Sequence, residues 1–450
     1  MAYRKYSNSS LAKAIKSLYL SEEMADVHFV FKPNNGPSHR IPTHRNLLIA
    51  TSEVFRVMFN GSWKEKHDVL IVDTSPSAFV EFLQFFYYDE VELTTENIGH
   101  VMNMGQKYDV AECLNACSRF LEYNMTNENV CTAYELAILF NRSRLMEMCE
   151  MNIAVNTKEV FNSSSFLECQ RQTLGHILEL NSMSCSEADV FDACMAWVRA
   201  ATKQDTLTTE LIRTQLSDSL YDIRFGTMAV NKFNAINAAY KTLFSSDEYL
   251  DITQTIISKK YESIYFNEKR RQYSWDTTLP IVRCKREFDE ASELIHDIDE
   301  PISTTFYVNT TLLLRGIYCV EMLRLQNWPQ SLSEDLTGKL TVIETRGRLS
   351  TQEVSSIVYI DENIKLIAGK NTVISFTRPV IIRNGVKYTV QLDLNMKFKC
   401  CSLICFKNTD LIIERHNEPK LLGTFRNDVV KDGKKRGVIF GLQLGKHIAN

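Results

Sequence analysis

Apolar and polar residues follow two different periods in the N-terminal part of the chain. Residues 27–31 and 69–72 are short apolar runs typical of strands, whereas residues 9–20 carry apolar side chains at helical spacing. Residues 43–60 contain two further amphipathic runs, separated by Thr51 and Ser52, which can end one helix and cap the next. Ser75 and Pro76 predict another helix start, and residues 95–105 and 107–122 predict two more helices. Strands followed by helices indicate an α+β domain over residues 1–123.

The pattern changes twice after this domain. Residues 124–250 read as helices and contain no proline, which predicts an all-α domain. Residues 251–302 include an acidic stretch and predict a linker. Residues 303–450 consist of short runs rich in β-branched residues, which indicate an antiparallel β-sandwich. Asn384 and Gly385 lie between two such runs, at 380–382 and 386–388, and predict a tight hairpin.

Composition excludes several classes of protein. A chain of 450 residues with 44% hydrophobic and 24% charged residues is typical of a globular protein with three or four domains. The net charge of −4 indicates neither nucleic-acid nor membrane binding by the chain as a whole. The twelve cysteines lie mostly within apolar runs, as free thiols do in a reducing compartment. With no apolar segment near Met1, we expect a cytoplasmic protein, with the nucleus as the alternative.

The N-terminal 123 residues resemble a BTB (POZ) domain. The resemblance is carried by five segments, at residues 25–27, 44–45, 52–59, 85–88 and 105–108. The helical region resembles a BACK domain, best at residues 174–178 and 190–197. Residues 303–450 resemble a PHR β-sandwich, through residues 315–318, 374–380 and 385–389. The resemblance therefore implies three domains in the order BTB, BACK and PHR-like sandwich.

The resemblance implies a substrate adaptor of a ubiquitin ligase. The resemblance implies that the BTB domain forms a homodimer and docks a type-3 cullin scaffold, while the C-terminal sandwich presents an unidentified protein substrate. It implies no catalytic residue and no cofactor. A BTB dimer that serves as a transcriptional or cytoskeletal scaffold remains the alternative, because members of this family do both.

The cullin contact is expected at the end of the second helix of residues 43–60. Trp63, Lys64 and Glu65 match the family's pattern of a hydrophobic residue and an acid, just after the helix that ends at Phe59, and Phe59 is expected to belong to the same contact. An exposed indole can anchor a partner, and a nearby carboxylate can orient it. Tyr87 is expected to flank this surface. The competing interpretation is that Trp63 folds back onto its own domain and Glu65 is solvated.

The dimer interface is expected on the helix of residues 9–20. Its apolar stripe includes Leu11, Ile15 and Leu18, for which its own domain offers little cover. Asp26 and Arg45 match a charged pair that family members hold near the interface. A structural ion pair that keeps strand and helix in register explains these two residues equally well.

No metal or catalytic site emerges from the sequence. His28, His39 and His44 lie near a predicted hairpin without a cysteine, and Cys400, Cys401 and Cys405 lack a second ligand pair. Cys113 and Cys117 are one helical turn apart on a predicted buried stripe, which indicates core positions. The sequence contains no phosphate-binding loop, nucleophile elbow or zinc-protease motif, so an enzyme in the sandwich is the least favoured alternative.

Overall fold

The computed structural model describes most of the chain, in the following ranges: residues 9–32, 38–60, 68–258, 260–271, 281–285, 288–296, 301–309, 311–319, 323–324, 336–347, 353–367, 370–395, 400–406, 410–413, 420–426 and 439–445. The chain divides into two compact units. The first comprises residues 1–150 and 162–174, and the second comprises residues 151–161 and 175–450.

The first unit begins with the predicted α+β domain. Its sheet has the order β2-β1-β3, with β2 antiparallel and β3 parallel to the central strand; the strands are β1 (Val27–Phe31), β2 (His39–Thr43) and β3 (Asp68–Ile71). Phe29 of β1 is fully buried, and its ring lies 4.6 Å from that of Phe79 and 5.9 Å from that of Phe55. These aromatic contacts join the sheet to the helices and form the core of the domain.

Helices account for the rest of the first unit. They are α1 (Ser9–Ser17), α2 (Arg45–Thr51), α3 (Glu53–Asn60), α4 (Pro76–Tyr87), α5 (Ile98–Lys107), α6 (Ala111–Asn124), α7 (Val130–Leu139), α8 (Ser143–Val155), which ends in the second unit, and α10 (Ser164–Leu167). Ser52 caps α3 by accepting the N–H of Phe55 at 3.2 Å, and Ser75 caps α4 by accepting the N–H of Ala78 at 3.2 Å. Both predicted caps are confirmed.

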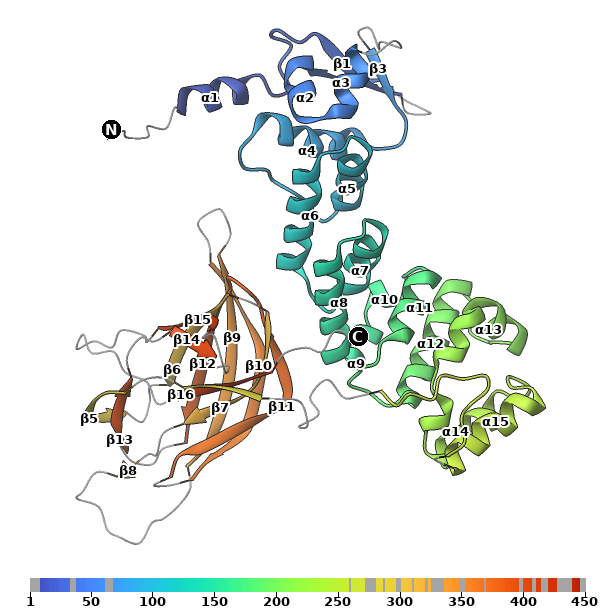
Figure 1. Cartoon of the computed structure of the whole chain (residues 1–450), viewed down its shortest axis with the longest axis vertical. Coiled ribbons are helices and arrows are strands. Elements are labelled where there is room, and N and C mark those ends of the chain that lie inside the picture. The colour runs from blue at the N-terminus through green and yellow to red at the C-terminus, as the bar shows by residue number, and fades with distance from the viewer. Residues whose placement is uncertain are drawn as a thin grey trace. The chain divides into compact units, whose positions relative to one another are not determined.

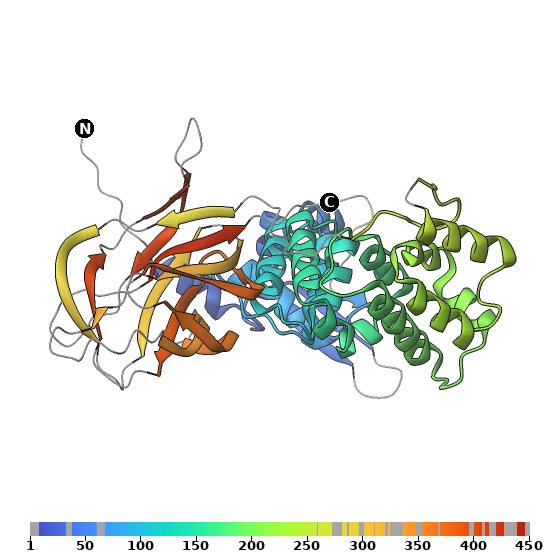
Figure 2. The ribbon, with the colours of Figure 1, turned by 90° about the horizontal axis from the view of Figure 1, so that it is seen from below.

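The helical region continues into the second unit as predicted. Its further elements are α9 (Thr157–Phe161), α11 (Arg171–Glu179), which begins in the first unit, α12 (Glu187–Thr202), α13 (Thr209–Leu216), the 3-10 turns η1 (Ser217–Asp222) and η2 (Phe225–Thr227), α14 (Val230–Ala239) and α15 (Ser246–Ile257). Helices α12 and α13 contact one another, and α14 and α15 lie in the same helical part of the ribbon, which is green to yellow-green in both views (Figures 1 and 2). None of the helices that the structure describes is long and apolar enough to span a bilayer.

The prediction of a linker over residues 251–302 is wrong in most of its length. Helix α15 extends to Ile257, and the segment 260–271 is held against the helices by buried charges. Nε of Arg271 donates to Glu187 at 2.7 Å, and both side chains are less than a tenth exposed. Glu187 also accepts the backbone N–H of the fully buried Arg224 at 3.2 Å. Single charges far apart in sequence produce no local pattern. The sequence therefore does not predict the ion pair between Arg271 and Glu187 that holds this segment.

The C-terminal strands form the predicted antiparallel sandwich. One sheet has the order β10-β9-β12-β6-β15-β14, a second has β11-β7-β16-β4, and a smaller one has β5-β13-β8. The strands are β4 (Ile281–Lys285), β5 (Phe288–His296), β6 (Ile302–Val308), β7 (Leu312–Cys319), β8 (Leu323–Arg324), β9 (Leu336–Gly347), β10 (Glu353–Leu366), β11 (Thr372–Ile382), β12 (Lys387–Leu394), β13 (Cys400–Phe406), β14 (Asp410–Ile413), β15 (Lys420–Arg426) and β16 (Ile439–Gly445). Strands β4 and β5 therefore belong to the sheets, although their residues fall within the predicted linker.

The hairpin predicted at Asn384 and Gly385 is also wrong. Strand β11 pairs with β7, whereas β12 pairs with β6 and β9, so the turn carries the chain from one sheet to the other. Gly385 has a φ of +74°, as a tight turn requires, and its N–H donates to the carbonyl oxygen of Val308 at 3.1 Å. The dipeptide signals the local turn correctly, but the long-range partners of each strand decide which sheet it joins.

Strand β7 is buried at every position, which a strand of an open sandwich face would not be. Leu312 and Leu314 lie in the sandwich core, and Leu313, which is fully buried, packs with Met151 and Val155 at the end of α8. These helical residues belong to the same compact unit as the sandwich. The continuous apolar run of β7 is therefore explained by cover on both of its faces.

Candidate protein-interaction surface

Helix α1 exposes part of its apolar stripe and is joined to the end of α4 mainly through Tyr19, which follows it. Leu11 is 60% exposed, whereas Ile15 and Leu18 are half-buried. Tyr19, just after the helix, anchors it: its hydroxyl donates to the carbonyl oxygen of Val80 at 2.7 Å, and its ring lies 5.6 Å from that of Tyr87. The helix is thus anchored after its C-terminal end, whereas Leu11 near its start faces solvent.

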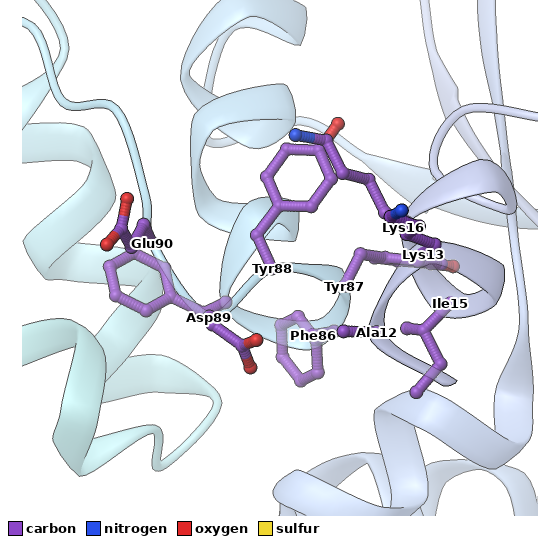
Figure 3. Close-up of a pocket in the computed structure, with 10 residues that line it drawn as sticks. Ala12, Lys13, Ile15, Lys16, Phe86, Tyr87, Tyr88, Asp89 and Glu90 are labelled. Atoms are coloured by element: carbon purple, nitrogen blue, oxygen red, sulfur yellow. The ribbon is translucent and has the colours of Figure 1, made fainter. Parts of the chain in front are cut away.

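A pocket of about 490 Å³ separates α1 from the segment that follows α4 (Figure 3). Lys13 and Lys16 project from α1 on one side, and Asp89 and Glu90 lie on the other. The ammonium group of Lys16 lies 4.9 Å from the ring centroid of Tyr88, a cation–π contact. The walls of the pocket thus carry opposite charges over an aromatic floor. The sequence does not predict this pocket, because the residues of α1 and those after α4 that line it lie about 70 positions apart in the chain.

The hydroxyl of Tyr87 makes its hydrogen bonds within its own chain. Its hydroxyl oxygen accepts the backbone N–H of His44 at 3.1 Å and lies 2.9 Å from Nδ1 of the same residue. Nε2 of His44 lies 2.8 Å from the carbonyl oxygen of Glu23, which can only accept, so Nε2 carries the proton. In the tautomer with its hydrogen on Nε2, Nδ1 is the acceptor for the Tyr87 hydroxyl. Burial raises the pKa of Tyr87 to about 12, with a smaller contribution from Asp26, so the hydroxyl stays protonated and donates.

Asp26 and Arg45 do not form the side-chain ion pair that the sequence predicts. Oδ1 of Asp26 accepts the backbone N–H of Arg45 at 2.8 Å, which ties the start of β1 to the start of α2. The guanidinium instead lies 5.2 Å from the ring centroid of Phe59. Its Nε and Nη2 have no hydrogen-bond partner in the described part of the chain. The correction follows from helix geometry, because the first N–H groups of a helix lack partners and attract a nearby carboxylate.

Of the four residues predicted to contact a cullin, the structure describes two, Phe59 and Tyr87. Phe59 is 2% exposed and stacks on Phe55, and Tyr87 is 4% exposed. Neither ring faces solvent, so each can shape the surface only from beneath. Trp63 and Glu65 lie outside the described residues, so their role stays a prediction.

The histidines and cysteines considered as metal ligands have other surroundings. His28 pairs with Glu22 at 2.8 Å, and His44 is held by Tyr87 and Glu23. Cys113 and Cys117 are fully buried in α6, which confirms their predicted place in the core. The side chains of Cys400, Cys401 and Cys405 lie outside the described part of the structure.

Comparison with known proteins identifies the first two domains. The family model of the BTB/POZ domain matches residues 15–125, and the BACK model, described as "BTB And C-terminal Kelch", matches residues 130–233. The chain therefore contains a BTB/POZ domain followed by a BACK domain, as the sequence resemblance implied.

Two curated relatives extend this match. BTB/POZ domain-containing protein 3 of Homo sapiens is 32% identical over 258 residues, which are 57% of this chain and 49% of that protein. BTB/POZ domain-containing protein 6 of Homo sapiens is 32% identical over 234 residues, 51% of this chain and 43% of that protein. The chain thus spans about half the length of the curated relatives it matches. The solved BTB domain of human gigaxonin is 18% identical and covers 27% of this chain and 98% of its own, with a TM-score of 0.23.

Proposed function

We propose that this protein is a dimeric substrate adaptor of a type-3 cullin ubiquitin ligase. The observation that carries the proposal is the order of its parts: a BTB/POZ domain and a BACK domain, followed by a β-sandwich. An adaptor needs one surface for the ligase and another for the substrate, on different domains of one chain. The adaptor itself performs no chemistry, because holding a substrate near the transferase raises its effective concentration.

The proposal assigns a role to each domain. Helix α1 would pack against a second copy through Leu11, which its own domain leaves exposed. The segment after Phe59, with Trp63 and Glu65, would contact the cullin, and the first BACK helices, over about residues 126–155, would complete the docking groove. The PHR-like sandwich would bind the substrate. We expect the protein to work in the cytoplasm or the nucleus.

A double substitution tests the cullin site. Trp63→Ala with Glu65→Lys removes the anchor and reverses the orienting charge, and is expected to weaken binding of purified type-3 cullin at least about tenfold from micromolar affinity. A matched control is Tyr265→Ala with Glu262→Lys, which alters an exposed aromatic residue and a nearby exposed acid on the second unit. Titration with full-length chain and light scattering would report cullin affinity and dimer mass.

The outcomes separate the alternatives. Unchanged cullin binding by the double variant would refute the site assignment. A wild-type chain that forms dimers but binds no cullin would support the non-ligase scaffold instead.

A further inference from the structure

Strand β10 is the outermost strand at one end of the six-stranded sheet. It is 14 residues long and, among the strands that the structure describes, it pairs only with β9. Residues 354–360 of this strand carry no charged side chain and no proline. Natural sheets usually protect such edges with charges, proline or a β-bulge, because the unpaired N–H and C=O groups can accept a further strand. The edge of β10 over residues 354–360 has neither a charge nor a proline, and it contains one bulge.

A β-bulge places two isoleucines on the same face beside this edge. Ile357 pairs with Ile343 and Tyr359 with Val342, so Val358 is the additional residue. The shift brings Ile360 opposite Thr341, two residues from Ile343 on β9 and therefore on the same face as Ile357. Ile357 is 62% exposed and Ile360 is 44% exposed.

The other face of the bulge is fixed to the sandwich core. The Tyr359 ring is 3% exposed and stacks on Phe376 with 4.4 Å between the centroids. Its hydroxyl oxygen accepts the N–H of Thr377 at 3.0 Å. Because Tyr359 cannot turn outward without breaking these contacts, the bulge holds both isoleucines in place without a partner.

The acidic residues at the end of this edge favour a positively charged residue in a partner. Glu362 is already paired with Lys339 at 2.9 Å. The carboxylate of Asp361, directly after Ile360, accepts the N–H of Asn363 at 3.0 Å and has no cationic partner among the described residues. A second bulge, between Asp361 and Ile364, ends the regular edge there. A basic residue on an added strand would therefore lie best beside Asp361.

We propose that the edge of β10, over residues 354–360, is a strand-addition site for an extended segment of a partner protein. The segment would run antiparallel, as every other pair in this sheet does, with a basic residue first and alternating aliphatic residues after it. Backbone hydrogen bonds would supply affinity, and Ile357, Ile360 and Asp361 would supply selectivity. This deepens the proposed function, on which it rests, by naming the kind of substrate segment that the sandwich recognises.

A labelled peptide tests the site on the full-length chain. The probe is fluorescein-Lys-Ile-Thr-Ile-Thr-Ile-Ser, and fluorescence anisotropy measures its binding. Two further versions of the peptide carry N-methyl groups on every second backbone amide. The amides that are methylated in one version are left free in the other. Strand addition uses only every second amide of the added strand, so one version should lose at least about tenfold in affinity while the other binds like the parent peptide.

Substitutions locate the binding on β10. Ile357→Lys, which places a cation at the exposed edge, is expected to weaken peptide binding at least about tenfold. Val72→Lys changes another exposed aliphatic residue, on the first unit, and should leave the affinity unchanged. No binding of the probe, equal binding of both methylated peptides, or full affinity in the Ile357 variant would overturn the proposal. So would self-association of the chain through this edge, which would show that a second copy is its partner.

The result of the cullin-binding experiment does not depend on the result of the peptide-binding experiment. Ile357→Lys should keep the cullin affinity of the wild type, because β10 and the predicted cullin contact lie on different domains. A chain that binds the peptide but no cullin would retain the strand-addition site and lose the ligase role.

Discussion

The hydroxyl of Tyr87 and the imidazole of His44 form a closed hydrogen-bonded pair beneath the proposed dimer surface, with 2.9 Å between the oxygen and Nδ1. The same oxygen accepts the backbone N–H of His44, so one side chain holds the start of α2 against the end of α4. This relationship explains why a tyrosine predicted to contact a partner is turned inward.

Tyr87→Phe should destabilise the BTB domain by about 1–3 kcal/mol, because it leaves a buried N–H and a ring nitrogen without partners. Hydrogen exchange at the His44 amide is the direct measurement, and the rate should rise. Tyr88→Phe, on the adjacent half-buried tyrosine, serves as the control and should leave that amide protected. An unchanged rate in the Tyr87 variant would contradict the assigned hydrogen bond.

Leu11→Asp should shift the protein from dimer to monomer, because a carboxylate would have to be desolvated in an apolar interface. Light scattering across a dilution series measures the change in mass. Val72→Asp is the matched control, since Val72 is 83% exposed on the same domain outside α1. A Leu11 variant with the dimer mass at every concentration would remove α1 from the interface.

Arg271→Ala should release the segment 260–271 from the helices. Breaking a buried ion pair by removing one partner costs about 3–5 kcal/mol, because Glu187 is left as an uncompensated charge. Hydrogen exchange over residues 260–271 should accelerate, and the thermal transition of this region should fall. Arg270→Ala, at the exposed neighbouring position, should change neither; equal effects of the two variants would show that no specific ion pair holds this segment.

Asp251 should make the helical region sensitive to acid. Burial alone would raise its pKa, but hydrogen bonds from the N–H of Ile264 and the hydroxyls of Ser263 and Tyr261 outweigh it and lower the pKa. A carboxyl whose pKa is lower in the folded state stabilises the fold above its unfolded pKa of about 3.9 and loses that contribution as the pH falls further. Melting temperatures of Asp251→Asn should therefore depend less on pH below about 4 than those of the wild type.

The exposed carboxylate on the same helix gives the control for this pH profile. Asp247→Asn should keep the acid sensitivity of the wild type, since Asp247 lies at the surface of α15. Parallel profiles for the wild type and the Asp251 variant would show that Asp251 is not the responsive group.

Gly385→Ala should destabilise the sandwich by about 1–2 kcal/mol, because an alanine at positive φ is strained. A side chain at this position would meet no atom within 4 Å, so the backbone conformation is the only cost. Gly385→Asn should lose less stability, because asparagine tolerates the left-handed region. Thermal unfolding of the full chain compares the variants, and an equal loss for both would point to another cause.

Local patterns in the sequence were sufficient for most of the elements and for the order of the three folds. Helical spacing and caps at Ser52 and Ser75 predict α3 and α4, and β-branched runs predict most strands of the sandwich. These signals lie within a few residues of one another, because a helix period, a cap or a turn is a property of adjacent backbone.

Only the tertiary structure decided how distant residues combine. The turn at Asn384 and Gly385 connects two sheets instead of closing one hairpin. Arg271 pairs with Glu187, which lies 84 residues away in the chain. Asp26 accepts the backbone N–H of Arg45 and does not pair with its guanidinium. Strand partners and buried charges depend on which surfaces meet after the chain folds. Their energies come from desolvation and long-range pairing, for which the sequence carries no local period.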